Sequence, residues 1–405
     1  MSNEKIAPTQ TLTIPKIEKP TSHASRALDS LTHQALTLGA SDIHLERRNK
    51  VLSLRFRVDG ILRPLDPPPL ELHESLVACI KVLAHMRTDV RTLPQDGRYT
   101  LQHSTGVVDV RVSIVPAYWG EKVVLRLLRK PAGRRALEDL GFSAENAALI
   151  KKAIHQPDGL VLVTGPTGSG KTTTLYEILE TVSERDISVV SLEDPVEYGL
   201  DRVTQIPIRE KQQFNFSTAL RALLRQDPDV IMVGEIRDPE TAELAATAAL
   251  TGHLVLSTLH TMDAARTITR LLTMGVPDHL IAPSLSLVVS QRLARKVCEK
   301  CAVQNEIPKW CLEMSPRAAA SGLTHQKKGA GCAACLKTGY TGRMVLNEVL
   351  VVDDPVRDLI RSQARGSDIK AHLKKVEWKD IFDSGIEAVR AGVTNFEEVF
   401  RVIQR

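Results

Sequence analysis

The sequence lacks any long apolar run. None of its 405 residues falls in a stretch apolar enough to form the ~20-residue helix that spans a bilayer. Residues 1–16 also lack the apolar core that a secretory signal peptide requires. We therefore expect no export signal, and any role at a membrane should be peripheral.

A strong charge of either sign is also missing. The chain has 53 Lys and Arg against 48 Asp and Glu, a formal net charge of +5. This balance is too mild to imply nucleic-acid binding by itself. Hydrophobic residues make up 43% and charged residues 25%, as in folded globular proteins. At ~100–200 residues per domain, the length predicts two or three domains.

Cysteine is scarce, and its spacing is informative. Four of the six cysteines form two C-x-x-C pairs, Cys298 with Cys301 and Cys332 with Cys335. In a chain without an export signal, this spacing favours metal binding over disulfides. Four thiolates suit tetrahedral Zn²⁺, and a closed set of four is normally structural. The sequence predicts a zinc site, with reduced cysteines in a loop as the alternative.

The chain divides by composition. Residues 1–25 are polar and rich in proline, which predicts a flexible tail. Residues 26–129 combine a helical pattern with alternating strand-like stretches, which predicts a small α+β domain. Residues 130–136 are basic and break both periodicities, so we interpret them as a linker. The predicted strands are Val51–Val58, Val107–Val115 and Val123–Leu128.

Residues 137–405 follow a different pattern. Short apolar runs without strict alternation are separated by helical patterns, as expected for strands buried on both faces of a mainly parallel sheet. This region is therefore predicted to be α/β. The runs are Leu160–Val163, Ile187–Leu192, Val230–Val233 and Leu254–Leu256.

A phosphate-binding loop follows the first run. The segment fits G-x-x-x-x-G-K-[ST] fully and lies between a strand and a helix. Its glycines let backbone N–H groups surround phosphate oxygens, Lys171 supplies positive charge to the phosphates, and the Thr172 hydroxyl can bind Mg²⁺. We expect an ATP–Mg²⁺ site. The predicted binding residues are Gly165, Pro166, Thr167, Gly168, Ser169, Gly170, Lys171, Thr172 and Thr173.

Carboxylates end two of the other predicted strands. Glu235 follows Val230–Val233, where it could hold Mg²⁺ through water or position the attacking water. Glu193 could supply the carboxylate that orients or deprotonates water, and the residues alone do not decide between the two. His253 and His260 flank another strand, as γ-phosphate sensors or as structural histidines.

Several further motifs occur in a fixed order along the chain, and with them it resembles the secretion ATPase superfamily, nearest the type II secretion and type IV pilus assembly ATPases. The resemblance covers nearly everything from Ser41 to Arg405. The segments that carry it are 41–46, 55–60, 93–98, 108–113, 120–126, 193–197, 224–238 and 252–261.

The resemblance implies a RecA-like motor domain behind a PAS-like domain, with the cysteines in an insertion at residues 296–340. It implies a cytoplasmic homohexamer, peripheral at the inner membrane, that uses ATP to raise pilin-like subunits. It also makes His253 and His260 residues of the γ-phosphate side. Arginines of the first domain are expected to complete the site, unless they pair with local carboxylates such as Asp96 and Asp109. By motif position they are Arg98, Arg111 and Arg126.

Partners follow from the same resemblance. Platform proteins of the inner membrane are the expected partners, although members of the secretion type usually dock through a further N-terminal domain. About 40 residues precede the Ser41 motif, so we do not expect docking through such a domain. Basic residues around the cysteines form either a solvated face or a contact for an acidic partner or acidic lipids. They are Arg292, Arg295, Lys296, Lys300, Lys327, Lys328 and Lys337.

Two alternative functions remain open. One is a motor for DNA uptake or conjugative transfer, which would use the same chemistry. The other is a zinc-ribbon nucleic-acid-binding protein that uses ATP only as a switch. Against the second, the cysteine segment has almost no aromatic residues for base stacking, so we do not expect nucleic acid as a partner.

Overall fold

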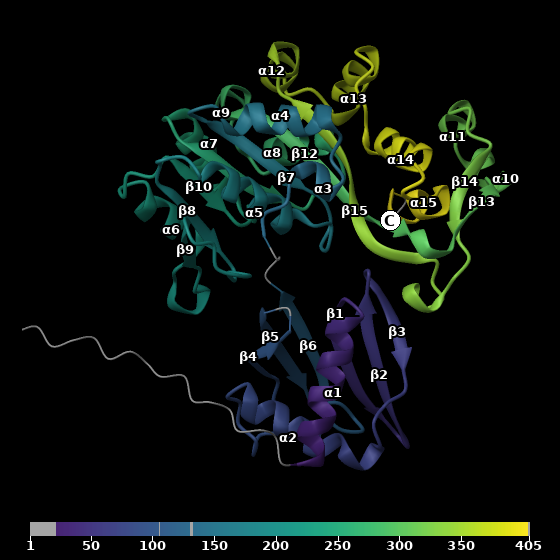
Figure 1. Ribbon diagram of the computed structural model, residues 1–405. Helices are drawn as coiled ribbons and strands as arrows, with labels where there is room; N and C mark the ends of the chain where they lie inside the picture. The colour runs from purple at the N-terminus through teal and green to yellow at the C-terminus, as the bar shows by residue number, and fades with distance from the viewer. Residues whose placement is uncertain (1–21, 105, 130–132, 404–405) are drawn as a thin grey trace, which may run out of the picture. The chain divides into compact units, whose positions relative to one another are not determined.

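The computed structural model falls into two compact units, Met1–Arg129 and Lys130–Arg405. Figure 1 shows the helices and strands of both units. In the part of the chain that the structure describes, no helix is both long enough and apolar enough to cross a membrane. The described residues are 22–104, 106–129 and 133–403.

The predicted tail ends earlier than expected. Helix α1 (His23–Thr37) begins inside the segment 1–25, and the side chain of Ser22 caps it by accepting the N–H of Ser25. Residues 23–25 are therefore helical, while residues 1–21 lie outside the described residues. Of the predicted linker, residues 130–132 also lie outside them.

The first unit is built on a six-stranded antiparallel sheet in the order β3-β2-β1-β6-β5-β4. Helices α1 and α2 (His73–Leu83) share one apolar core with it, and a short 3₁₀ turn, Leu70–Leu72, precedes α2. The prediction of a small α+β domain is confirmed. The strands are β1 (Ala40–Arg48), β2 (Val51–Val58), β3 (Ile61–Leu65), β4 (Gln95–His103), β5 (Gly106–Val115) and β6 (Lys122–Arg129).

Alternation in β5 explains why this sheet has one apolar face. Val110 and Val112 are buried beneath the helices, whereas Arg111 between them points to the other face. Side chains alternate along a strand, so every second residue joins the core. The polar face is left for charged residues.

The second unit contains a seven-stranded sheet in the order β15-β12-β7-β11-β10-β8-β9. All neighbours run parallel except β15, which is antiparallel to β12. The mainly parallel α/β prediction is confirmed, and each predicted apolar run overlaps a strand, although Ile187 and Ser188 precede β8. The strands are β7 (Gly159–Thr164), β8 (Val189–Glu193), β9 (Thr204–Pro207), β10 (Val230–Val233), β11 (Leu254–Leu259), β12 (Leu285–Val297) and β15 (Tyr340–Val351).

Helices cover both faces of this sheet and bury two separate apolar cores. One core takes side chains from α3 (Leu137–Leu140), α4 (Ala144–Ile154) and α5 (Lys171–Val182). The other core is built by more helices, which explains why the central strands are apolar on both sides. These are α6 (Phe216–Leu223), α7 (Pro239–Leu250), α8 (Ala264–Thr273), α9 (Asp278–Ser284), α12 (Asp354–Arg361) and α13 (Gly366–Lys375).

The segment with the four cysteines joins β12 to β15, and these two strands run on together beyond the other strands of the sheet (Figure 1). It carries its own small antiparallel sheet, and a fourth apolar core joins it to the C-terminal helices. The elements here are β13 (Ala302–Glu306), β14 (His325–Gly329), α10 (Lys309–Met314), α11 (Pro316–Ala320), α14 (Ile381–Arg390) and α15 (Phe396–Ile403). Short 3₁₀ turns occur at Glu210–Gln212, Glu299–Cys301 and Ala333–Cys335.

Candidate nucleotide site and four-cysteine cluster

The loop between β7 and α5 has the backbone that phosphate binding needs. Gly165, Gly168 and Gly170 all have positive φ, a conformation that other residues rarely adopt. Gly165 is also confined, since a Cβ there would lie 2.5 Å from the carbonyl oxygen of Gln291. The loop ends at the N-terminus of α5, whose free N–H groups attract anions.

Lys171 folds back over this loop. Its Nζ donates hydrogen bonds to the carbonyl oxygens of Gly165, at 2.7 Å, and Pro166, at 3.3 Å. Burial lowers the pKa of Lys171 to about 8. The ammonium is thus held where phosphate oxygens would neutralise it.

Glu193, the last residue of β8, is enclosed by hydrogen-bond donors. Its carboxylate accepts the hydroxyls of Tyr176 and Ser191 and the amide of Gln205, which lies at 3.0 Å. The residue is 3% exposed. Three donors fix the direction of the carboxylate.

Glu235 follows β10 and meets two basic side chains. Arg237 Nη2 lies 2.6 Å from one carboxylate oxygen, and His260 Nε2 lies 3.4 Å from the other. Burial alone would raise the pKa of Glu235, but these two contacts hold that pKa below its ordinary value. Glu235 therefore stays ionised near neutral pH.

These groups gather at the carboxyl ends of β7, β8, β10 and β11, around a cavity of about 380 Å³. Ligands bind at this edge in open α/β sheets. The lining includes Thr167 to Thr173 of the loop, together with Glu193, Glu235, His260 and Arg343.

His253 does not join this cluster. It precedes β11, whereas His260 follows it, so the two histidines lie at opposite ends of one strand. Its Nδ1 lies 3.0 Å from the carbonyl oxygen of Ala248 at the end of α7. A six-residue strand is roughly 20 Å long. His253 therefore does not line the cavity with His260, against the expectation that both face the γ-phosphate, and its contact with Ala248 agrees with the alternative of a structural histidine.

The three arginines form a row across the sheet of the first unit. Arg98 on β4 pairs in register with Arg111 on β5, which pairs with Arg126 on β6. Arg126 in turn pairs with Asp42 on β1, and its Nε lies 3.0 Å from that carboxylate. Cross-strand neighbours share a face. The row therefore presents several guanidinium groups on the polar side of the sheet, and the carboxylate that Arg126 contacts is neither Asp96 nor Asp109.

Several residues at the site were not predicted. Arg237 lay within a motif that carries the resemblance, and its spacing from Glu235 was the available signal. Tyr176 and Gln205 hold Glu193 from α5 and β9, and no sequence pattern marks them. Arg343 reaches the cavity from β15, far along the chain.

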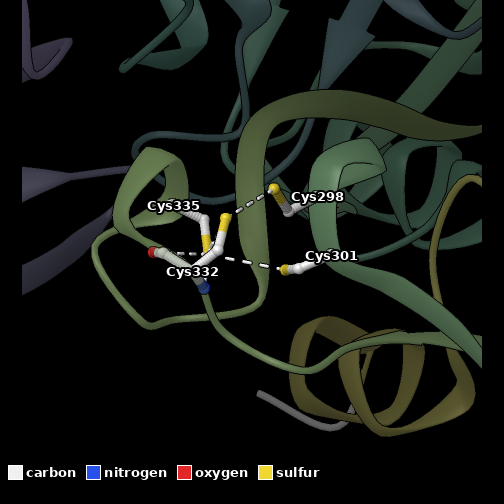
Figure 2. Close-up of side chains that lie close together, drawn as sticks. All are labelled: Cys298, Cys301, Cys332 and Cys335. Carbon is white, nitrogen blue, oxygen red and sulfur yellow. Dashed lines mark hydrogen bonds between the residues drawn. The ribbon is translucent and has the colours of Figure 1, made fainter.

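The four predicted cysteines converge in space. Figure 2 shows their side chains pointing toward one another, and all four Sγ atoms lie within 4.8 Å of each other. Cys298–Cys332 is 3.9 Å, and Cys301–Cys335 is 3.8 Å. Tetrahedral zinc with Zn–S bonds of ~2.3 Å requires S···S separations of ~3.8 Å. The cluster therefore fits a tetrahedral metal ion.

Backbone groups support this arrangement. The N–H groups of Cys332 and Gly339 donate to Cys335 Sγ at 3.1 and 3.2 Å, and that of Gly331 donates to Cys301 Sγ at 3.3 Å. Such donors stabilise thiolates. A set of four sulfur atoms with N–H donors suits zinc better than magnesium or calcium, which prefer oxygen ligands.

The basic residues near the cysteines do not form one solvated surface. Arg292 is 6% exposed and donates to the carbonyl oxygen of Met262. Arg295 forms a buried ion pair with Glu398, at 2.7 Å. Any contact with acidic lipids would therefore be made by the lysines of this set and not by these two arginines.

Taken together, the glycine loop, the parallel sheet and the carboxylates at its edge define a P-loop nucleotide-binding protein. A model of the type II/IV secretion system proteins matches residues 18–401. The chain belongs to this family. The type II secretion system ATPase E of Vibrio cholerae is 43% identical over 377 residues, which cover 93% of this chain and 75% of that protein. The type IV pilus assembly ATPase PilB of Pseudomonas aeruginosa is 41% identical over 385 residues, 93% of this chain and 67% of that protein.

Solved structures share the fold. The Legionella pneumophila ATPase DotB matches with a TM-score of 0.69 at 23% identity, over 94% of this chain and 96% of that chain. The pilus retraction motor PilT with bound ADP matches with a TM-score of 0.62 at 25% identity, over 92% and 95% of the two chains. The predicted family and RecA-like fold are confirmed.

Proposed function

We propose that this chain is an ATP-hydrolysing motor that drives assembly of pilin or pseudopilin subunits in type II secretion or type IV pilus formation. The observation that carries the proposal is the meeting of Lys171, Glu193, Glu235 and His260 around one cavity at the sheet edge. The chain is similar to two proteins whose names state such roles, a type II secretion system ATPase E and a type IV pilus assembly ATPase PilB.

The nucleotide is held from the loop side. Lys171 leaves the carbonyl oxygens of Gly165 and Pro166 and takes phosphate oxygens as partners, while the N–H groups of the loop surround the phosphates. The Thr172 hydroxyl would be a ligand for Mg²⁺, and Glu235 would hold the ion through water. When bound, Mg²⁺ neutralises charge that develops on the phosphate oxygens.

The two glutamates take different parts. Glu193 is fixed in direction by three donors and orients the attacking water from the far side of the cavity. Glu235 stays ionised, beside Arg237 and His260, and serves the metal and γ-phosphate side. This assignment separates water activation from charge neutralisation.

The working form is proposed to be a cytoplasmic homohexamer at the inner membrane. Arginines of the row Arg98, Arg111 and Arg126 would add positive charge to the transferring phosphoryl group as the first domain closes, which can increase the rate by ~10³–10⁵. Platform proteins of the membrane are the proposed partners, and the lysines near the cysteine cluster are a contact for acidic lipids. Zn²⁺ on the four cysteines would stabilise that region.

The test measures ATP hydrolysis by the purified chain and pilus or secretion assembly in a host. The purified chain should hydrolyse ATP, and Lys171→Ala should abolish turnover while the circular dichroism spectrum is retained. In a host that lacks its own pilus or secretion ATPase of this family, the chain should restore assembly only with Lys171 intact. Normal turnover by Lys171→Ala would contradict the proposal, and ATP-dependent DNA uptake without pilus assembly would favour a DNA motor instead.

A further inference from the structure

Strand β12 continues past the end of its neighbour. Ser290 on β12 pairs with Thr164, the last residue of β7, yet β12 extends to Val297. The next two residues, Gln291 and Arg292, therefore run beside the phosphate loop. Both are polar, and both are buried in the middle of a strand. A buried polar side chain is costly unless its hydrogen bonds are made, so their partners identify their role.

The side-chain amide of Gln291 is hydrogen-bonded at both ends, to the phosphate loop and to α5. Nε2 donates to the carbonyl oxygen of Ser169 at 2.9 Å, and Oε1 accepts the hydroxyl of Thr174 at 3.0 Å. Gly170 passes between, and a Cβ there would lie 3.2 Å from Nε2. The residue is 0% exposed. Gln291 thus fixes the end of the loop and the first turn of α5 to β12, with Lys171 in between.

Arg292 points to the opposite face of the strand, as alternation requires. Its Nη2 donates to the carbonyl oxygen of Met262 at 2.8 Å, and the hydroxyl of Ser290 lies 3.4 Å from the same oxygen. Met262 closely follows His260 in the segment that leads from β11 to α8. Arg292 therefore holds the segment that carries His260.

We propose that Gln291 and Arg292 are positioning residues for ATP hydrolysis. Gln291 sets the phosphate loop with Lys171, and Arg292 sets the segment with His260. Because the two residues are adjacent on one strand, β12 fixes the distance between Lys171 and His260, the two side chains proposed to contact the transferring phosphoryl group. The proposal rests on the ATPase function proposed above, and it assigns to this strand a role beyond core packing.

The two residues should have different kinetic signatures. The phosphate loop contacts phosphates that ATP and ADP share, so loss of Gln291 should weaken both nucleotides. The His260 segment faces the γ-phosphate, which only ATP carries. Loss of Arg292 should therefore lower kcat while leaving ADP affinity unchanged. A merely structural role would give both variants the same pattern.

The experiment uses the full chain with Gln291→Met and Arg292→Met, which keep an unbranched side chain but remove the hydrogen bonds. Binding of fluorescent ADP, binding of a non-hydrolysable ATP analogue, kcat and the melting temperature are measured for each. Gln291→Met should weaken both nucleotides about tenfold, as expected for two lost hydrogen bonds. Arg292→Met should reduce kcat about 10–100-fold with ADP affinity within about twofold, and Arg292→Lys should restore part of kcat.

Matched controls lie elsewhere in the same unit. Gln326 is a buried glutamine that also makes two hydrogen bonds, with Glu397 and Phe396. Arg295 is a partly buried arginine on β12 that pairs with Glu398. Gln326→Met and Arg295→Met should lower the melting temperature without either kinetic signature. If Gln291→Met does not fold, Thr174→Val, which removes the hydroxyl that Gln291 Oε1 accepts without adding charge, replaces it.

Several outcomes would overturn the proposal. One is ADP affinity reduced equally by Arg292→Met and Gln291→Met, and another is the same kinetic pattern in the control variants. Failure of the proposed function is distinguishable, since wild-type protein would then show no turnover. In that case nucleotide binding by Gln291→Met still decides the role of Gln291, and unchanged ADP and ATP affinity would refute it.

Discussion

Glu235 and His260 follow the neighbouring parallel strands β10 and β11, and their side chains meet at 3.4 Å across the sheet edge. Arg237 approaches the same carboxylate from the other side, at 2.6 Å. Any change of charge at Glu235 is therefore felt by both basic residues and, through the cavity, by Lys171. The contact therefore links Glu235 to His260, the residue proposed to lie on the γ-phosphate side.

Neutralising Glu193 or Glu235 tests the separate roles proposed for these two glutamates. Glu193→Gln should reduce kcat by about 10²–10⁴, the range for a lost general base, with nucleotide affinity retained. Glu235→Gln should reduce kcat by about 10²–10³ and raise the Mg²⁺ concentration needed for half-maximal activity. Steady-state ATPase assays over a Mg²⁺ titration measure both effects.

The control for both variants is Glu240→Gln, on an exposed glutamate of α7 that pairs with Arg221. It should leave kcat and the Mg²⁺ requirement unchanged. An unaltered Mg²⁺ requirement in Glu235→Gln would contradict the division of roles between the two glutamates.

The sequence predicted some parts of the fold and not others for physical reasons. Strands such as β7 and β10 are apolar on both faces, so a short apolar run is enough to find them. Strand β12 was missed because its middle, around Gln291 and Arg292, is polar yet buried. Only the tertiary partners of these side chains make that burial favourable, and such partners leave no periodic pattern.

The residues of the site also differ in whether the sequence could predict them. The phosphate loop is local, and its spacing alone defined it. The resemblance assigned His253 to the γ-phosphate together with His260, although the two residues lie at opposite ends of β11. Tyr176 and Gln205 contact Glu193 only after α5 and β9 pack beside β8, which no local pattern reports.

The four-cysteine cluster should contain one zinc ion per chain. Cys332→Ser removes a thiolate, so bound zinc should be lost and the melting temperature should fall by roughly 5–10 °C, at about 2–4 °C per kcal/mol. Elemental analysis and thermal melts check this. Cys79→Ser, on α2 and outside the cluster, is the control and should retain the metal. Protein purified without chelator that contains no zinc would refute the site.

The arginine row should contribute to catalysis and not to nucleotide binding. Arg111→Ala should lower kcat by about 10³ or more while ATP affinity changes little, because its charge would act on the transition state. Arg87→Ala is the matched control, since this exposed arginine of the same unit pairs with Asp89. Turnover and nucleotide binding of the full chain, over a range of protein concentrations, separate the two effects. Equal activity of the two variants would exclude the role.

Glu348 should make stability depend on pH. This β15 residue is 2% exposed, and its carboxylate accepts the N–H groups of Ala264, at 2.7 Å, and Ile381, at 3.0 Å, at the starts of α8 and α14. Burial raises the pKa of Glu348 to about 7 from an ordinary 4.5, although both N–H groups oppose the shift. Asp263 and Asp380 add to the rise, and Arg292 faces the same region.

The sign follows from linkage. Between about pH 4.5 and 7 the folded state holds a proton on Glu348 that the unfolded state releases, so stability is greatest below 4.5 and is lost as pH rises. The loss reaches at most about 1.4 kcal/mol per pH unit, roughly 3 kcal/mol in all. Urea unfolding of wild type and Glu348→Gln at pH 5, 6, 7 and 8 measures it, because the wild-type advantage should shrink as pH rises. Glu398→Gln is the control: Arg401 and Arg295 outweigh burial and lower the pKa of Glu398, so its difference from wild type should stay flat over this range. A flat difference for Glu348→Gln as well would show that Glu348 is ionised throughout, its two helix N-termini outweighing its burial.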